Sequence, residues 1–334
     1  MTALLEPAPD LDPAAASLSL LVTSVRLEAQ DVISITLADP LGQDLPEWGP
    51  GAHLELELPS GLRRQYSLCG SSADRKTYRV AVLREANGRG GSRELHDTGV
   101  VGRRLNVYGP RNHFELCPSS RYLFIAGGIG ITPILAMVRA VSEEASWVLH
   151  YGGRSLASMA FVDELAELGG ERVRVTPQDV HGLLDLDAIV GSADDSTVIF
   201  CCGPSVLLDA VQETRARLAP QVPLYFERFG AAPAGSKAAV LPEGRERAFE
   251  VELRRTGVTL QIDPDCTVLD AIREVVPAMP FSCTEGYCGS CEVAVLDGVP
   301  DHRDEILTPE ERESGRTMFP CVSRSCTDRL VIDL

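Results

Sequence analysis

The sequence has no long run of apolar residues. Hydrophobic residues make up 44% of its 334 residues, which is ordinary for a globular protein. No stretch approaches the roughly 18 consecutive apolar residues of a membrane-spanning helix. The first 18 residues also lack the basic start and continuous apolar core of a secretory signal. We therefore expect residues 1–18 to be a disordered leader, and the protein to be cytoplasmic without binding a membrane.

Basic residues are also scarce. The chain has 31 Lys and Arg against 48 Asp and Glu, a formal net charge of −17. Nucleic-acid binding requires clustered Lys and Arg against the phosphates, so this balance argues against it. About half of the acidic excess lies in residues 248–334. An acidic surface there would steer the docking of a basic electron acceptor, or would simply keep the protein soluble.

Four of the ten cysteines have the spacing of a plant-type [2Fe–2S] cluster. Cys283, Cys288 and Cys291 follow the pattern C-x4-C-x2-C, and Cys321 comes after a long gap. Cys326 lies five residues further on and fits the gap less well. A zinc site remains an alternative, because four thiolates also bind zinc. The six histidines lack the C-x-H and C-x-x-H pairs of a Rieske centre, so the chain is not expected to be a Rieske oxygenase itself.

The pattern of the sequence changes along the chain. Residues 19–116 contain short β-type runs separated by turn residues, which predict an antiparallel barrel or sandwich. Residues 117–229 alternate strand and helix, with helices expected over residues 133–145 and 204–218, which predicts a parallel sheet covered on both faces. Residues 230–247 are rich in Ala, Pro and Gly and read as a linker. Residues 248–334 predict a hairpin, a helix capped by Thr267, the cysteine loop and two final strands.

Two glycine-rich turns suit phosphate groups. Arg64 and Tyr66 lie on a predicted strand, and residues 87–92 form a glycine-rich turn before a probable helix. Together they suit a flavin mononucleotide, with Arg64 on its phosphate and Tyr66 over its ring. Residues 126–133 form a second such turn after a strand, although they do not match the strict Rossmann fingerprint.

Two further motifs follow later strands of the alternating segment. Residues 201–204, C-C-G-P, stand at the carboxyl end of a strand, where open α/β sheets bind their ligands. Phe226 and Glu227 come at the end of the last strand of this segment. An aromatic ring and a carboxylate at that place are suited to contact a redox cofactor.

In this order the motifs resemble those of the phthalate dioxygenase reductase family, which is similar to vanillate O-demethylase reductase subunits. R-x-Y-S-L, G-R-G-G-S, A-G-G-I-G-I-T-P, C-C-G-P, F-E-x-F and C-x4-C-G-x-C occur in family order over residues 19–334. The resemblance implies three parts: an antiparallel β-barrel flavin domain, an α/β Rossmann-like nicotinamide domain and a C-terminal α+β β-grasp ferredoxin domain. It also implies that electrons pass from NADH to FMN, then to the [2Fe–2S] cluster, and then to a terminal Rieske-type oxygenase, a demethylase or ring-hydroxylating dioxygenase. We expect the reductase to be a monomer.

The resemblance also implies roles for single residues. Those assigned to hydride transfer are Ser67, whose hydroxyl would lie near flavin N5, Cys202 and Glu227. Those assigned to the flavin are Arg64, Gln65, Tyr66, Ser67, Ala81, Val82, Leu83, Gly90, Gly91, Ser92 and Phe226, which would stack on the ring face. Those assigned to the nicotinamide cofactor are Gly128, Thr132, Arg154, Cys202, Gly203 and Glu227.

Several alternatives stay open at this point. The chain could be an electron-transfer or redox-sensing iron–sulfur module without hydride transfer, or a reductase that serves a cytochrome P450. No obvious insertion could bind an adenosine group, which favours FMN over FAD. NADPH is an alternative to NADH, because Arg154 and Ser155 could meet a 2′-phosphate.

Overall fold

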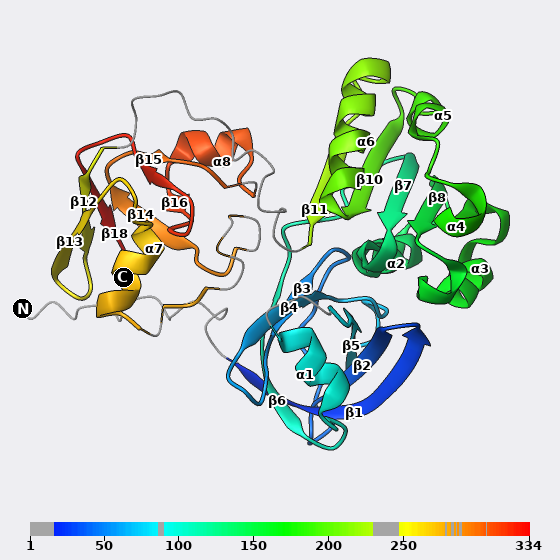
Figure 1. Cartoon of the computed structure of the whole chain (residues 1–334), viewed down its shortest axis with the longest axis horizontal. Helices are drawn as coiled ribbons and strands as arrows, with labels where there is room; N and C mark the ends of the chain where they lie inside the picture. Colours follow the sequence, from blue (N-terminus) through cyan, green and yellow to red (C-terminus); the bar gives the residue numbers. More distant parts are fainter. Residues whose placement is uncertain are drawn as a thin grey trace, which may run out of the picture. The chain divides into compact units, whose positions relative to one another are not determined.

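The computed structural model describes residues 17–85, 90–229, 247–277, 279–281, 284, 286, 289–304 and 306–334. The chain divides into two compact units, Met1–Phe229 and Gly230–Leu334. Figure 1 colours the first from blue to green and the second from yellow to red. None of the helices in the described ranges is both long and apolar enough to cross a membrane.

The first sheet of the first unit is antiparallel and has the strand order β4-β3-β6-β1-β2-β5. Its strands are β1 (Leu18–Ala29), β2 (Val32–Ala38), β3 (His53–Glu57), β4 (Arg63–Ser67), β5 (Thr77–Leu83) and β6 (Arg104–Arg111). A bridge between Leu68, directly after β4, and Val80 on β5 connects the two edges of the sheet. The sheet therefore closes into a barrel, which decides between the barrel and the sandwich. Alternate residues such as Leu54 and Leu56 on β3 fill its interior.

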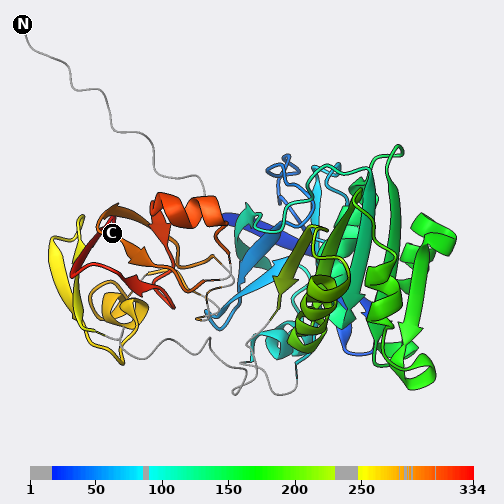
Figure 2. The same cartoon turned by 90° about the horizontal axis from the view of Figure 1, so that it is seen from above.

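The second sheet of this unit, green in Figure 2, is parallel and has the order β11-β10-β7-β8-β9. Its strands are β7 (Arg121–Gly127), β8 (Ser146–Gly153), β9 (Val173–Pro177), β10 (Thr197–Gly203) and β11 (Leu224–Arg228). The chain runs outward from β7 to β9 and then returns to the other side of β7 with β10. The topological switch point, where ligands of such sheets bind, therefore lies between the carboxyl ends of β7 and β10.

Helices cover both faces of the parallel sheet. They are α2 (Ile131–Ala140), α3 (Val162–Gly169), α4 (Gln178–His181), α5 (Leu186–Gly191) and α6 (Ser205–Leu218). Neighbouring residues of β7 show the division: Phe124 packs with α2 and α3, whereas Ile125 packs with α5 and α6. The helix expected to extend to residue 145 ends at Ala140, because Val141 adopts an extended conformation and a turn follows.

The second unit contains a mixed sheet with the order β13-β12-β18-β14-β16. Its elements are β12 (Phe249–Leu253), β13 (Val258–Ile262), α7 (Val268–Val275), β14 (Val293–Asp297), β15 (Pro300–Asp301), α8 (Pro309–Ser314), β16 (Thr317–Met318), β17 (Arg324–Ser325) and β18 (Arg329–Ile332). The predicted hairpin joins β12 to β13, and β18 lies parallel to β12. The Thr267 side chain accepts a hydrogen bond from the Asp270 N–H, which confirms the predicted helix cap. This arrangement is the β-grasp fold.

Candidate active site

The turns after β7 and β10 approach each other so closely that only glycine fits. A β-carbon at Gly130 would lie 2.3 Å from the Cys202 carbonyl oxygen. One at Gly203 would lie 3.0 Å from the backbone of Gly127. The two glycine motifs of the sequence therefore meet at the topological switch point. Their backbone N–H groups and the start of α2 can approach a nucleotide there.

The three residues expected to act in hydride transfer come together beside this switch point. Ser67 ends barrel strand β4, and its Oγ donates a hydrogen bond of 3.4 Å to Oε2 of Glu227 on β11. Glu227 and Cys202 are register partners on adjacent parallel strands, so their side chains point to the same face. The group thus combines a hydroxyl from the barrel with a carboxyl and a thiol from the parallel sheet.

Burial controls the charge of two of these groups. It raises the pKa of the half-buried Glu227 to about 8, and the hydrogen bond from Ser67 opposes this shift only in part. Burial also raises the pKa of the fully buried Cys202 thiol well above its usual value, and the nearby Glu227 charge adds to the shift. At pH 7 the site is therefore largely uncharged: a thiol, a hydroxyl and a carboxylic acid.

The residues expected to hold the flavin phosphate lie together on the barrel. Gly90 has a left-handed backbone (φ 91°) and precedes α1 (Gly91–Asp97). A β-carbon on Gly91 would lie 2.7 Å from Cγ of Arg64, so glycine is needed for α1 to approach this arginine. The Ser92 hydroxyl accepts a hydrogen bond from the Glu85 N–H. This glycine cradle against a guanidinium fits a phosphate group. Residues 86–89, the rest of the turn, lie outside the described residues.

The residues expected along the flavin ring occupy β4 and β5. Tyr66 packs against the barrel core, and burial raises the pKa of its hydroxyl. Gln65 is its neighbour on β4 and is half-buried. The Val82 side chain is fully buried in the barrel core. Its neighbours on β5 are Ala81, which belongs to the core of the parallel-sheet part, and Leu83, which is half-buried at the edge of that core. The Val82 carbonyl oxygen is 2.9 Å from Nε2 of His96, a contact that the sequence did not suggest.

The aromatic residues at the end of β11 differ from the expectation. Phe226 packs against the core on the α5 and α6 side of the sheet, whereas Glu227 faces the other side. Phe229 packs against the core that contains Ala81 and, at its edge, Leu83. Alternation along a strand explains this, since neighbours on a strand point to opposite faces. The geometry therefore separates Phe226 from Ser67.

The remaining residues expected at the nicotinamide site lie along the same edge of the parallel sheet. Gly128 begins the turn after β7 with a left-handed backbone (φ 54°). The Thr132 hydroxyl donates to the Ile129 carbonyl, 3.0 Å away, and so fixes the first turn of α2. Arg154 follows β8 and is exposed, and its carbonyl accepts the Asp179 N–H. These positions suit a nucleotide laid across the carboxyl ends of β7, β8 and β10.

The second unit holds the two described cysteines of the cluster spacing. Cys291 and Cys321 are 3% and 5% exposed and belong to the core of this unit. Cys283 and Cys288 lie outside the described residues. Cys326 is exposed, and its thiol is 3.9 Å from the Pro300 carbonyl oxygen, which favours Cys321 as the fourth ligand.

The backbone around these cysteines is shaped for a tight loop. Gly286 and Gly289 both have left-handed backbones (φ 77° and 73°). A β-carbon on Gly286 would lie 2.6 Å from Cγ2 of Val322, the residue after Cys321. Gly286 therefore lies directly against the segment that carries Cys321. Buried thiols beside such a loop fit a [2Fe–2S] cluster.

A buried carboxylate fixes the segment on the other side of this loop. Asp304 accepts hydrogen bonds from the N–H groups of Ile306 and Leu307. Arg312 lies 3.6 Å from the same carboxylate and also donates to the Asp304 carbonyl. Since Cα of Asp304 is 3.1 Å from the position of a Gly286 β-carbon, this segment packs closely against Gly286.

Comparison with known proteins agrees with this geometry. Residues 251–326 match the 2Fe-2S iron-sulfur cluster binding domain, and residues 124–213 match the oxidoreductase NAD-binding domain. The chain is 42% identical over 322 residues to phenoxybenzoate dioxygenase subunit beta of Ectopseudomonas oleovorans, covering 96% of this chain and 98% of that protein.

Two solved structures are similar. The crystal structure of phthalate dioxygenase reductase has a TM-score of 0.67 and 35% identity, covering 95% of this chain and 98% of that one. An intact type IV self-sufficient cytochrome P450 monooxygenase has a TM-score of 0.86 and 41% identity, covering 99% of this chain but only 43% of that longer chain.

The fold and the site define an oxidoreductase that combines a nicotinamide domain, a flavin barrel and a [2Fe–2S] domain. The chain belongs to the phthalate dioxygenase reductase family. Its cofactors are NADH, FMN and a [2Fe–2S] cluster, as the resemblance implied.

Proposed function

We propose that this chain is the reductase component of an oxygenase system of the Rieske type, a demethylase or ring-hydroxylating dioxygenase. The single observation that carries the hydride-transfer step is the meeting of Ser67, Cys202 and Glu227 at the switch point of the parallel sheet. The relative from Ectopseudomonas oleovorans is named as a subunit of a dioxygenase, which supports an oxygenase as the acceptor.

The residues at this point have separate tasks in the proposal. When bound, FMN accepts the hydride of NADH as an electron pair and releases electrons singly. The Ser67 hydroxyl lies at the reacting edge of the ring, and Glu227 holds its proton beside it. The thiol of Cys202 closes the nicotinamide side and excludes water. Gly128, Thr132 and Gly203 hold the pyrophosphate, while the exposed Arg154 meets the ribose of NADH.

The flavin is held by the barrel in this proposal. Gly90, Gly91, Ser92 and Arg64 take the phosphate, and Tyr66 covers one face of the ring. Because Phe226 packs on the far side of the sheet, we assign the aromatic contact on the nicotinamide face to Phe229 instead. In the second unit, Cys283, Cys288, Cys291 and Cys321 ligate the cluster.

We also propose the following division of the chain: a leader (1–18), a flavin domain (19–116), a nicotinamide domain (117–229), a linker (230–247) and a ferredoxin domain (248–334). The six-stranded barrel, the parallel sheet and the mixed sheet support it, since each falls within one of these ranges apart from Leu18. The protein would act as a monomer in the cytoplasm.

Anaerobic reduction of the purified protein by NADH tests the proposed function. We expect the flavin absorbance to bleach, and the reduced protein then to reduce a purified Rieske oxygenase, measured by the electron paramagnetic resonance signal of its Rieske centre. If protein that carries flavin is not bleached by NADH, the reductase function is refuted. The alternative, an electron-transfer module without hydride transfer, would then take its place.

A cytochrome P450 is the second candidate acceptor, because the similar self-sufficient monooxygenase is one. The same reduced protein would be mixed with a purified cytochrome P450 under carbon monoxide. If the reduced protein transfers electrons to the cytochrome P450 and not to the Rieske centre, the proposed acceptor is a cytochrome P450 rather than a Rieske oxygenase.

A further inference from the structure

Four charged residues form an ion network between the barrel and the parallel-sheet part of the first unit. Arg79 on β5 donates to both carboxylate oxygens of Glu164 on α3, at 3.0 and 2.9 Å. Its other terminal nitrogen donates to Glu28 on β1 at 2.8 Å. Arg139, in the last turn of α2, also donates to Glu164. We call this set of Glu28, Arg79, Arg139 and Glu164 the ion network.

The network is largely removed from water. The side chains of Glu28, Arg79, Glu164 and Arg139 are 5%, 20%, 22% and 27% exposed. Exposed ion pairs contribute little to stability, but breaking a desolvated pair leaves a charge without compensation. One terminal nitrogen of Arg79 binds Glu164 and the other binds Glu28, so the planar guanidinium fixes the direction as well as the distance between the two carboxylates. The network therefore sets the geometry between its elements more firmly than surface pairs do.

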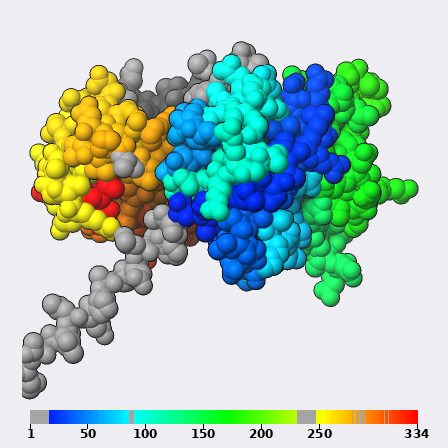
Figure 3. Space-filling view, turned by 90° about the horizontal axis from the view of Figure 1, so that it is seen from below, coloured from blue at the N-terminus to red at the C-terminus, as the bar shows by residue number. Residues whose placement is uncertain are grey.

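Neighbouring contacts hold the central guanidinium in place. The Arg79 guanidinium lies over the buried Phe161 ring, 4.8 Å from its centroid. The Arg79 carbonyl accepts the backbone N–H of Cys69. Close by, the Gln30 N–H donates to the Ala157 carbonyl at 2.8 Å, which is a second bond between the barrel and the parallel-sheet part. Figure 3 shows the blue surface of the barrel in direct contact with green residues of the parallel-sheet part.

The network connects the two elements that flank the proposed hydride-transfer site. Arg79 stands two residues before Ala81 on β5, the strand assigned to the flavin edge. Arg139 is in the last turn of α2, the helix that starts at the glycine turn after β7. Glu164 binds both arginines and so ties β5 to α2. A shift of one element against the other would change the distance between the nicotinamide and the flavin.

We infer that the ion network is a positioning device for hydride transfer, with Arg79 and Glu164 as the positioning residues. The inference rests on the proposed function. Hydride transfer requires the reacting atoms in near contact, and a misplacement of about 1 Å can lower the rate by roughly 100-fold. The bond between Arg79 and Glu164 holds the nicotinamide-binding sheet in register with the flavin-binding barrel, although neither side chain touches a reacting atom.

Stopped-flow reduction of the FMN-loaded protein by NADH tests the inference. For Arg79→Gln and Glu164→Gln we expect the limiting rate of flavin reduction to fall by about tenfold. The dissociation constant for NADH should stay within about twofold, since no NADH ligand is removed. The long-wavelength absorbance of the nicotinamide–flavin charge-transfer complex should weaken in parallel. Arg79→Lys, which retains the charge but not the two terminal nitrogens that bind Glu164 and Glu28 at once, should recover part of both.

Two matched variants control for loss of charge. Asp44→Asn removes a carboxylate from the exposed pair with Lys76 on the same barrel. Arg217→Gln removes a guanidinium from the exposed pair with Asp187, which joins α6 to α5 and lies outside the ion network. We expect both to reduce flavin at close to the wild-type rate.

Hydrogen exchange of the full chain supplies a readout that does not depend on turnover. The Gln30 amide, which is bonded across the same interface, should exchange faster in Arg79→Gln and Glu164→Gln than in Asp44→Asn. Faster exchange with an unchanged limiting rate and charge-transfer band would overturn the inference and leave a purely structural network. Wild-type protein that NADH does not reduce would instead refute the proposed function.

Discussion

Glu227 has its carboxyl group buried beside a hydroxyl rather than beside a cation. Burial raises its pKa from the usual 4.5 to about 8, so it carries a proton at neutral pH and loses it in mild alkali. In the proposed function, Glu227 would lie beside the nicotinamide, and its ionised form would favour the positive charge that hydride transfer puts on that ring more than its protonated form would. The charge state of this one residue should therefore tune the rate of the reaction.

We predict that the limiting rate of flavin reduction by NADH rises with pH as Glu227 ionises near pH 8. Glu227→Gln should remove this rise and keep the rate at the low-pH level or below, measured by stopped flow between pH 6 and about pH 9.5. Asp44→Asn should retain the rise. If Glu227→Gln rises with pH as the wild type does, another group controls the reaction.

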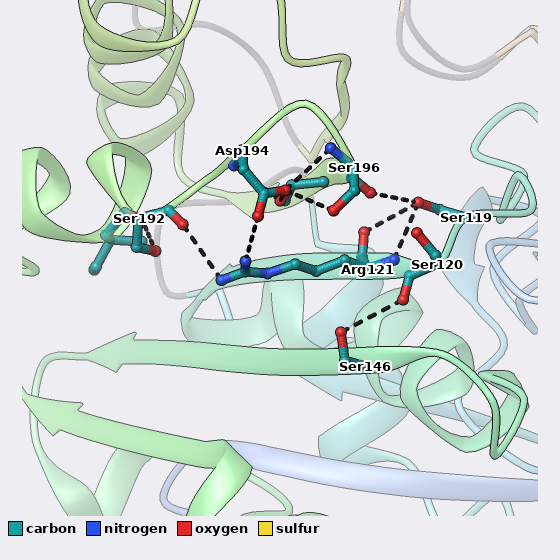
Figure 4. Close-up of polar contacts among 9 residues, drawn as sticks. Ser119, Ser120, Arg121, Ser146, Ser192, Asp194 and Ser196 are labelled. Carbon is teal, nitrogen blue, oxygen red and sulfur yellow. Dashed lines mark hydrogen bonds and ion pairs between the residues drawn. The ribbon is translucent and has the colours of Figure 1, made fainter.

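At the scale of elements, the carboxyl ends and the amino ends of the parallel strands carry different features. The glycine turns follow the carboxyl ends of the strands, whereas a cluster of polar contacts around Asp194, drawn in Figure 4, lies at the amino ends. Asp194 accepts hydrogen bonds from both the N–H and the hydroxyl of Ser196 and from the Thr197 hydroxyl. Arg121 at the start of β7 donates to it at 2.7 Å. The cluster ties the start of β7 to the loop before β10.

We predict that Asp194→Asn destabilises the protein without changing hydride transfer. The hydroxyl bonds from Ser196 and Thr197 lower the pKa of Asp194 to about 2, with Arg121 as a smaller cause. A lowered pKa stabilises the folded state above the ordinary value of 3.8, and this stability is lost as the pH falls toward 2. The unfolding temperature of the variant should therefore be lower at pH 7, with the difference shrinking as the pH falls below 4. An equal difference at pH 7 and at the acid end would contradict this assignment.

Local patterns identified many of the elements. Short β-type runs between turn residues predict a barrel or a sandwich for residues 19–116, and Thr267 with Asp270 three residues later predicts the cap of α7. The sequence pattern does not distinguish helices α3 and α5, because segments of eight and six residues are too short to show a clear helical periodicity of apolar residues. The extent of α2 was overestimated, since the polar residues after Val141 are compatible with a helix in sequence but form a turn.

Contacts between distant residues were beyond the sequence. Ser67 and Glu227 could be expected near one cofactor only through the family resemblance. The Arg79 to Glu164 bond joins residues 85 positions apart and carries no local signal. Phe226 was expected on the ring face, and the face to which it points depends on the register of β11 against β10. Each of these contacts depends on which strands and helices pack side by side, and the local sequence pattern carries no information about that packing.

At the scale of the whole molecule, the residues proposed for hydride transfer and those proposed for the cluster belong to different units. Ser67, Cys202 and Glu227 all lie in Met1–Phe229, whereas the described thiols of the cluster lie in Gly230–Leu334. Each unit has its own hydrophobic core. A lesion in the second should therefore leave the folding and the chemistry of the first intact.

We predict that Cys291→Ser or Cys321→Ser lowers electron transfer to the oxygenase at least about tenfold, because an alcohol would be a poor replacement for a thiolate that ligates iron. Flavin reduction by NADH should stay within about twofold of wild type. Stopped-flow flavin bleaching, cluster electron paramagnetic resonance and oxygenase reduction measure the three steps. Cys326→Ser, at an exposed thiol, is the matched control and should retain all three. Loss of flavin reduction together with the cluster, in protein that stays folded, would show that the two units do not work independently.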